Sequence, residues 1–346
     1  MSAWSQSLDA AGVREPRLRR DYDRQRDLVA GARRTSYLAA RLLLPRPMLP
    51  HVVTATAVMH HGDDLLDTGP RPRRVSAWAS WEGEVRAALD TGRSDDPLVR
   101  ALLHTTAAHP RLRVAVEEYL ATAAAELDFT GFATEADYQD YLDAYSLPAF
   151  MLVASLLGPE DDDGRFRAAC RTLIDGSQRL DFVNDLAEDL PEGRLGIPAR
   201  TLERFSVTAE DLAEGRRRVA VRELVEDQVE ASRVCLRAAG RLPVLTAGPG
   251  GVLLRAVVDI ELLTADAAYA RGAGLLRGAA SPPPLGTARV LLGARRRARG
   301  HRRRTVTAQR RAATGRWQAA AREWYRGTTG APKCPPRSHG RGRPGS

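Results

Sequence analysis

The chain is divided into helix-length segments, and none of its segments has the pattern of a β-strand. Alanine, leucine and arginine are abundant, and these residues are among the strongest helix formers. No run of β-branched residues alternates with polar residues between turn signals, so we expect no strands. The predicted fold class is therefore all-α.

Prolines and glycines mark where these helices end. A charged segment over 15–45 ends at Pro45 and Pro47, because proline cannot continue a helix. The next helix should run over 50–67 and break at the Gly-Pro pair that follows. Further helices are expected at 75–90, 97–108, 111–128, 135–157, 163–190, 208–240 and 249–276, with loops at 248–251 and 281–284.

The net charge of +9 is distributed unevenly along the chain. From Arg295 to the end there are 16 basic residues and one acid, whereas residues 1–294 contain 36 basic and 42 acidic residues. An acidic body is thus followed by a basic tail whose last twenty residues have a disordered composition. The tail could contact an acidic lipid surface, but it has no aromatic platform or motif for nucleic acid, so no nucleic-acid partner is expected.

The cysteines and the first residues predict a cytoplasmic protein. Cys170, Cys235 and Cys334 are far apart and belong to no CxxC or Cys/His cluster. Neither a disulfide framework nor a zinc site is therefore expected. The N-terminus lacks the basic start and apolar core of a signal peptide. The longest apolar stretch, over 147–158, is about half the length needed to span a bilayer.

Three aspartates end the helix expected over 50–67. Asp63 and Asp67 are four residues apart and share one helix face, with Asp64 beside them. Like charges at this spacing repel each other, and a hard divalent cation that also binds phosphate relieves the repulsion. The preceding residues 52–59 are almost entirely apolar or small. The pattern therefore predicts an apolar cavity with metal-binding carboxylates at its mouth.

A second acidic cluster lies on a later helix. Asp181, Asp185 and Asp189 recur every four residues on one face, and Glu188 precedes the last of them. Arg194 follows in a glycine-containing loop, where it can bind a diphosphate oxygen. Two carboxylate faces across an apolar cavity would clamp a metal-bound diphosphate and let an allylic cation form away from water.

These motifs resemble those of the squalene/phytoene synthase family over roughly residues 8–290. Residues 35–44 (TSYLAARLLL) resemble that family's opening SFYLAxxLLP segment, and DDLLD resembles its first Asp-rich motif. Residues 178–198 (QRLDFVNDLAEDLPEGRLGIP) resemble its QLTNILRDxxEDxxxGRxYLP motif. The resemblance implies the isoprenoid synthase fold, a single helical domain around a central cavity. We assign this domain to residues 1–293 and a basic, largely disordered tail to 294–346.

The resemblance also implies which residues bind metal and substrate. Mg²⁺, as two or three ions that Mn²⁺ could replace, would be held by Asp63, Asp64, Asp67, Asp185, Glu188 and Asp189. Asp64 and Glu188 would act indirectly, through the other ligands or through water. No organic cofactor is expected. The diphosphate would be held by Arg34, Ser36, His60, Gln178, Asn184 and Arg194. Tyr141 and Tyr145 would stabilise the cation through their π faces and complete the catalytic set with Asp63, Asp67, Asp185 and Asp189.

Several positions depart from the family's pattern, in which arginines hold two diphosphates. Thr35, His60 and Asn184 stand where the family has arginine, and Arg194 keeps its place. Fewer guanidinium groups imply weaker capture of a second diphosphate.

The third family segment, YCxYVAxxVG, aligns with residues 141–150. Tyr141 is kept, the second tyrosine falls on Ala144 beside Tyr145, and the glycine falls on Phe150. A bulky ring in a packed cavity leaves less room for a long prenyl chain. This segment therefore also favours a reaction other than standard phytoene or squalene formation.

We predict a prenyltransferase that ionises one allylic prenyl diphosphate and transfers the prenyl group to an acceptor, releasing diphosphate. In a divergent bacterial branch that resembles this family, the acceptor is an aromatic ring such as a carbazole, in specialised metabolism. The first alternative is head-to-head condensation to phytoene or squalene, in which a second prenyl diphosphate is the acceptor. The second alternative is a class I terpene cyclase, whose metal triad is matched in spacing, but not in its middle hydroxyl, by Asn184, Glu188 and Glu192. These hypotheses are compatible with either a monomer or a homodimer.

Overall fold

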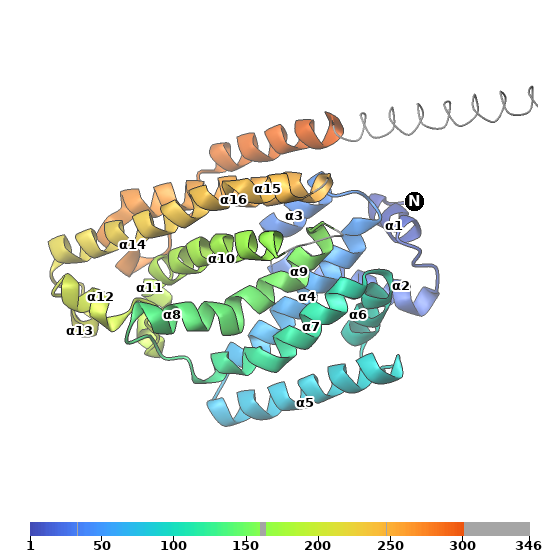
Figure 1. Cartoon of the computed structure of the whole chain (residues 1–346), viewed down its shortest axis with the longest axis horizontal. Coiled ribbons are helices and arrows are strands. Elements are labelled where there is room, and N and C mark those ends of the chain that lie inside the picture. The colour runs from blue at the N-terminus through green and yellow to red at the C-terminus, as the bar shows by residue number, and fades with distance from the viewer. Residues whose placement is uncertain (33, 160–163, 247, 301–346) are drawn as a thin grey trace, which may run out of the picture. The chain divides into compact units, whose positions relative to one another are not determined.

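The computed structural model describes residues 1–32, 34–159, 164–246 and 248–300. Met1–Ala298 form one compact unit. This unit is built of helices, as predicted (Figure 1). Its described residues include one isolated bridge, between Gly131 and Leu195, and no strand. The prediction that the last twenty residues are disordered concerns residues outside the described part of the chain.

Short connections join the helices. The first are α1 (Ala3–Ala10), α2 (Pro16–Ala32), α3 (Arg34–Leu43), α4 (Met48–Asp67), α5 (Arg71–Thr91), α6 (Pro97–Ala108), α7 (Pro110–Thr122) and η1 (Ala123–Asp128). Then come α8 (Glu135–Tyr141), η2 (Leu142–Ser146), α9 (Leu147–Leu157), α10 (Arg165–Asn184), α11 (Leu186–Asp189), η3 (Leu190–Glu192) and α12 (Ala199–Arg204). After them come α13 (Ala209–Ala213), α14 (Arg218–Ala238), η4 (Ala239–Arg241), α15 (Leu242–Leu245), α16 (Pro249–Arg271) and η5 (Gly272–Arg277). Residues 284–300 are also helical.

The helix predicted over 208–240 is interrupted, so that prediction is wrong in part. α13 ends before Gly215, and α14 begins after Arg217. These two residues have positive φ angles of 65° and 46°, which a right-handed helix does not contain. The short helices α1, α12 and α15 were not predicted.

The helix predicted over 135–157 is continuous but contains a π-helical turn. Leu142–Ser146 form this turn, η2, and the Leu147 N–H donates to the Leu142 carbonyl five residues back. Pro148 follows at once. A proline has no N–H to donate, and in an α-helix its ring presses on the carbonyl four residues back, so the wider turn relieves both problems. Such turns are frequent at functional sites.

Helices α4, α9 and α10 lie together at the centre of the unit, with α7 against α9 and α14 against α10 (Figure 1). Gly176 allows α10 and α14 to pack closely. A Cβ atom at this position would lie 2.8 Å from the Leu236 side chain and 3.0 Å from the Ser232 carbonyl oxygen. Close contact between the backbones of two helices therefore contributes to the packing of the unit, together with apolar side chains.

Two of the three cysteines are free thiols in the described part of the chain. Cys170 is buried and Cys235 is half-buried. Cys334 lies outside the described residues. None of the described helices has both the length and the apolar composition that crossing a membrane requires.

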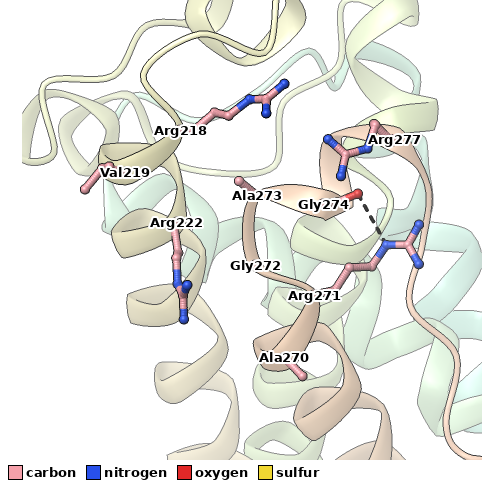
Figure 2. A pocket seen from close by; sticks show the side chains of 9 residues that line it. All are labelled: Arg218, Val219, Arg222, Ala270, Arg271, Gly272, Ala273, Gly274 and Arg277. Atoms are coloured by element: carbon pink, nitrogen blue, oxygen red, sulfur yellow. Dashed lines mark hydrogen bonds between the residues drawn. The ribbon is translucent and has the colours of Figure 1, made fainter.

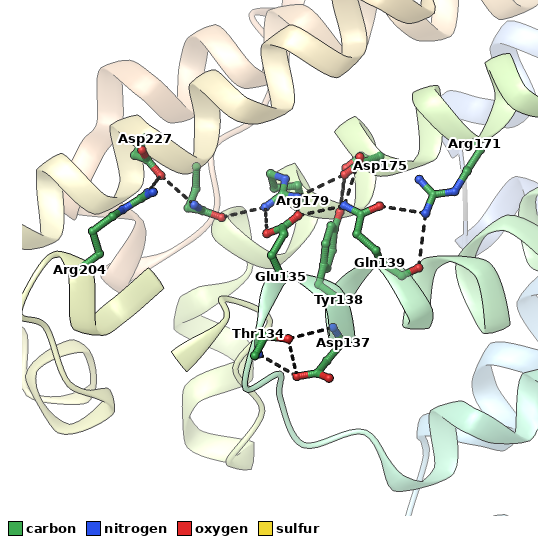
Figure 3. A network of polar contacts seen from close by, with 11 residues as sticks. Thr134, Glu135, Asp137, Tyr138, Gln139, Arg171, Asp175, Arg179, Arg204 and Asp227 are labelled. Atoms are coloured by element: carbon green, nitrogen blue, oxygen red, sulfur yellow. Dashed lines mark hydrogen bonds and ion pairs between the residues drawn. The ribbon is translucent and has the colours of Figure 1, made fainter. Parts of the chain in front are cut away.

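A buried arginine joins α8, α10 and α14 (Figure 3). Arg179 on α10 is 7% exposed, and its guanidinium contacts both carboxylate oxygens of Glu135 on α8. It also donates to Gln228 on α14 at 3.3 Å and lies 4.3 Å from the ring centroid of Tyr138. The Tyr138 hydroxyl donates to the Asp175 carbonyl at 2.9 Å. Because a buried charge is stable only when paired, this network holds α8 in place ahead of the π-helical turn.

We predict that Arg179→Ala lowers the free energy of unfolding by about 3 kcal/mol, because it removes a buried side chain together with its ion pairs. Arg204→Ala is the control, since the Arg204 side chain is 59% exposed and pairs with Asp227 at the surface. That change should cost less than about 1 kcal/mol. Urea unfolding measures both, and equal losses would contradict a special role for the buried network.

Candidate active site

A cavity of about 620 Å³ lies among α4, η2, α9, α10 and α16. Its polar lining includes Asp63, Asp67, Glu126, Tyr141, Tyr145, Gln178, Asp181, Asp185, Asp189, Arg194 and Glu261. Its apolar lining includes Met59, Ala149, Phe150, Val153, Leu173, Ile174, Phe182 and Val257. Both Asp-rich motifs therefore contribute side chains to the same partly apolar cavity.

The first motif is held in place by tyrosines. The Tyr145 hydroxyl donates to Asp63 Oδ1 at 2.7 Å. Burial, and then the negative charge of Asp63, raise the pKa of Tyr145 well above its ordinary value, so the hydroxyl keeps its proton. Next to Asp63, a Cβ atom on Gly62 would lie 2.2 Å from the Tyr119 hydroxyl. Only glycine at position 62 lets α4 approach Tyr119 this closely.

Arg194 connects the first motif to a buried glutamate. Its guanidinium donates to Asp67 Oδ1 at 3.0 Å and to Glu126 Oε1 at 2.6 Å, and the Tyr141 hydroxyl donates to Glu126 Oε2 at 2.6 Å. Burial raises the pKa of Glu126 to about 7, although Tyr141 and Arg194 act in the opposite direction. Burial alone would lower the pKa of Arg194, but Asp67 and Glu126 raise it, so the guanidinium stays charged.

The second motif crosses a break between two helices. α10 ends just before Asp185 and α11 begins just after it, so the helix predicted over 163–190 is interrupted at this point. Asp181, Asp185 and Asp189 nevertheless all line the cavity. Burial raises the pKa of Asp189, and the nearby Arg194 opposes this shift. A cation close to Asp189 would therefore favour its charged form.

The cavity is strongly acidic. Seven carboxyl groups line it, and Arg194 is the only arginine or lysine among its described lining residues. Carboxylate oxygens are the ligands that Mg²⁺ prefers, so the donor set fits this ion. In the described part of the chain, no three His, Cys, Asp or Glu side chains form a ready-made metal cluster. The fit to Mg²⁺ thus depends on the chemistry of the lining carboxylates.

Some of the predicted substrate-binding and metal-binding residues lie outside this lining. Ser36 and Gln178 line the cavity, and Gln178 Oε1 accepts a hydrogen bond from the Ser146 hydroxyl at 2.9 Å. Arg34, Asp64 and Glu188 are exposed and are not among its lining residues.

Asn184 and His60 also lie outside the lining. The Asn184 amide donates to the Ala280 carbonyl at 3.0 Å and accepts from the Ala280 N–H at 2.7 Å. This pair of bonds joins the end of α10 to the segment after η5, which is a structural contact. His60 Nδ1 is buried and has no hydrogen-bond partner among the described residues.

Sequence reasoning did not identify two glutamates of the cavity. Glu126 lies in η1, where nothing in the surrounding sequence marks it as buried. Glu261 lies on α16, and burial raises its pKa to about 7. One signal was available for Glu261, because it follows Val257 by four residues and so shares an apolar face of a long helix.

We predict that Glu261→Gln changes how stability depends on pH. In the unfolded chain this carboxyl ionises near its ordinary pKa of 4.5, whereas in the folded chain it ionises near 7. Wild-type stability should therefore fall as pH rises from about 4.5 to 7. The variant should match wild type at pH 4.5 and exceed it by roughly 2–3 kcal/mol at pH 8.

Urea unfolding with EDTA present measures this difference. The exposed Glu223→Gln on α14 is the control and should change stability by less than about 0.5 kcal/mol at both pH values. An unchanged pH dependence in Glu261→Gln would contradict the raised pKa.

Comparison with known proteins gives a family match and a curated relative. Residues 29–289 match the family model described as squalene/phytoene synthase. The bifunctional protein CrtB/UppS of Streptomyces coelicolor is 30% identical over 194 residues, which make up 55% of this chain. These residues cover 34% of the relative, so the match spans about a third of its length.

Solved structures share the fold. The squalene synthase HpnC from Alicyclobacillus acidocaldarius is 23% identical, with a TM-score of 0.65 over 78% of this chain and 99% of that one. A dehydrosqualene synthase solved with a ligand is 16% identical, with a TM-score of 0.70 over 82% of this chain and 98% of that one. The helical fold is therefore common to all three chains.

Proposed function

The chain belongs to the squalene/phytoene synthase family of prenyltransferases, and we propose that it uses Mg²⁺ to ionise one allylic prenyl diphosphate. The prenyl group would then pass to a small-molecule acceptor, such as an aromatic ring. The observation that carries this proposal is the composition of the cavity, in which seven carboxyl groups and one guanidinium of the described residues meet an apolar wall.

The charge of the cavity supports a requirement for divalent cations. A diphosphate anion would be repelled by this many carboxylates unless cations accompanied it. Asp63 and Asp67 from one motif, and Asp185 and Asp189 from the other, would hold the Mg²⁺ ions. Bound Mg²⁺ would neutralise the diphosphate and make it a better leaving group.

Protein side chains would orient the diphosphate and protect the cation. Arg194 and Gln178 line the cavity and can donate to phosphate oxygens, and Ser36 can add a hydroxyl. Tyr141 and Tyr145 present aromatic rings whose centroids are 5.6 Å apart. Their π faces would stabilise positive charge on the allylic fragment.

The scarcity of guanidinium groups favours one diphosphate over two. Arg194 is already bound to Asp67 and Glu126, so it has limited capacity for a second anion. Phe150 lines the cavity at the position where the family has glycine. Its ring would limit the length of the prenyl chain.

Transfer to an acceptor carbon also needs a base. The new carbon–carbon bond forms as the diphosphate leaves, and the acceptor then loses a proton. Glu261 lines the cavity from α16, a helix that carries neither Asp-rich motif. A carboxyl group with a pKa near 7 can take up this proton at neutral pH.

Head-to-head condensation is the second candidate, because the two solved relatives described above are named squalene synthase and dehydrosqualene synthase. A terpene cyclase is less well supported. Its metal triad would need Asn184, Glu188 and Glu192, none of which is among the lining residues of the cavity.

We predict that Mg²⁺ is needed for a non-hydrolysable prenyl thiodiphosphate to bind in the acidic cavity. EDTA should abolish binding at this cavity, and Asp67→Asn and Asp189→Asn should each weaken Mg²⁺-dependent affinity by about 10- to 100-fold. Asp90→Asn on α5 is the control. Asp90 is exposed and lies far from both motifs in the sequence, so this variant should bind like wild type. Unchanged affinity in both Asp67→Asn and Asp189→Asn would rule out the proposed metal ligands.

The number of diphosphates can be tested from the products. With Mg²⁺, one prenyl diphosphate and no acceptor, we expect no C30 or C40 hydrocarbon by mass spectrometry. Adding indole- or carbazole-type acceptors should produce a prenylated compound and free diphosphate. A C30 or C40 hydrocarbon would replace our proposal with head-to-head condensation and leave the family assignment intact.

A further inference from the structure

A second cavity, of about 490 Å³, is lined by arginines (Figure 2). Arg218 and Arg222 come from the first two turns of α14, Arg271 is the last residue of α16, and Arg277 is the last residue of η5. The remaining lining residues are small or apolar, and none is acidic. This cavity shares no lining residue with the acidic cavity of the candidate active site.

The charges of these four guanidinium groups are poorly balanced. Arg222 donates to Glu226 Oε1 at 2.7 Å, and Arg271 Nε donates to the Gly274 carbonyl at 3.3 Å. The guanidinium groups of Arg218 and Arg277 make no hydrogen bond or ion pair with any described residue. Elsewhere on the same helices, arginines are paired, as in Arg255 with Asp259 and Arg237 with Glu230.

Like charges placed around one cavity repel each other, and an anion bound between them offsets this repulsion by attracting each of them.

Glycines shape the turn that brings two of these arginines to the cavity. Gly272 has φ 51° and ψ −132°, a conformation that other residues rarely adopt. A Cβ atom on Gly274 would lie 3.0 Å from Arg271 Cγ. The turn is therefore compact enough for Arg271 and Arg277, six residues apart, to line the same space.

We propose that this arginine-lined cavity binds a phosphate-bearing ligand, either free diphosphate or the phosphate of a lipid headgroup. Guanidinium groups match phosphate oxygens in charge and in planar geometry. The backbone N–H groups at the start of α14, which has no side-chain cap, add to the positive potential beside Arg218. Val219 on the rim is 74% exposed and would tolerate a neighbouring acyl chain.

The test uses the full chain in EDTA, where the acidic cavity repels diphosphate. Isothermal titration with inorganic diphosphate would compare wild type, the double variant Arg218→Gln/Arg277→Gln, and a control, Arg237→Gln/Arg255→Gln. Both variants remove two exposed positive charges from this part of the protein, so they have the same net charge. We expect the first to lose at least about tenfold in affinity and the control to bind like wild type. Equal affinities for all three proteins would overturn the site for free diphosphate.

A second arm of the test distinguishes the source of the phosphate. Sedimentation with phosphatidic acid vesicles and with phosphatidylcholine vesicles would compare the same three proteins. The basic tail is present in each of them, so only a loss specific to Arg218→Gln/Arg277→Gln supports a lipid-phosphate site. If that double variant matches the control with diphosphate and with both vesicles, the proposal is wrong.

Discussion

Mutual repulsion among carboxylates is the constraint on which the candidate active site depends. Seven acidic side chains line a cavity that also has apolar walls, and desolvation makes such repulsion stronger than at the surface. In the protein alone, Arg194 and two tyrosine hydroxyls offset part of it. In the proposed reaction, the remaining negative charge would make a metal–diphosphate complex, with its cations, a suitable ligand.

Helix packing and ion pairs outside the cavity keep these charges in place. Gly62 allows α4 to pack against Tyr119, and the Arg179 network holds α8 ahead of the tyrosines. Neither Gly62 nor Arg179 is among the residues that line the cavity. The acidic groups can therefore face one another because packing and ion pairs elsewhere hold the helices that carry them.

Much of the fold and part of the site could be predicted from sequence. Long apolar-periodic segments predicted the central helices, and the carboxylate spacing predicted that Asp63, Asp67, Asp185 and Asp189 belong together. The break of 208–240 was missed because Arg217 adopts a positive φ that its residue type does not reveal. Glu126 and Glu261 were missed because burial of a single acid depends on tertiary packing. Asn184 was interpreted as a ligand, and its contact with Ala280, 96 residues away, could not be foreseen.

The π-helical turn at Leu142–Ser146 has a consequence for how such cavities can diversify. Each residue in a helix rotates the following side chains by about 100°, and this turn contains one residue more than an α-helical turn. Deleting that residue would rotate Phe150 and Val153 away from the cavity while Tyr141, on the other side of the turn, kept its position. The apolar wall of the cavity could then be remodelled by a single-residue length change, without any substitution in either acidic motif.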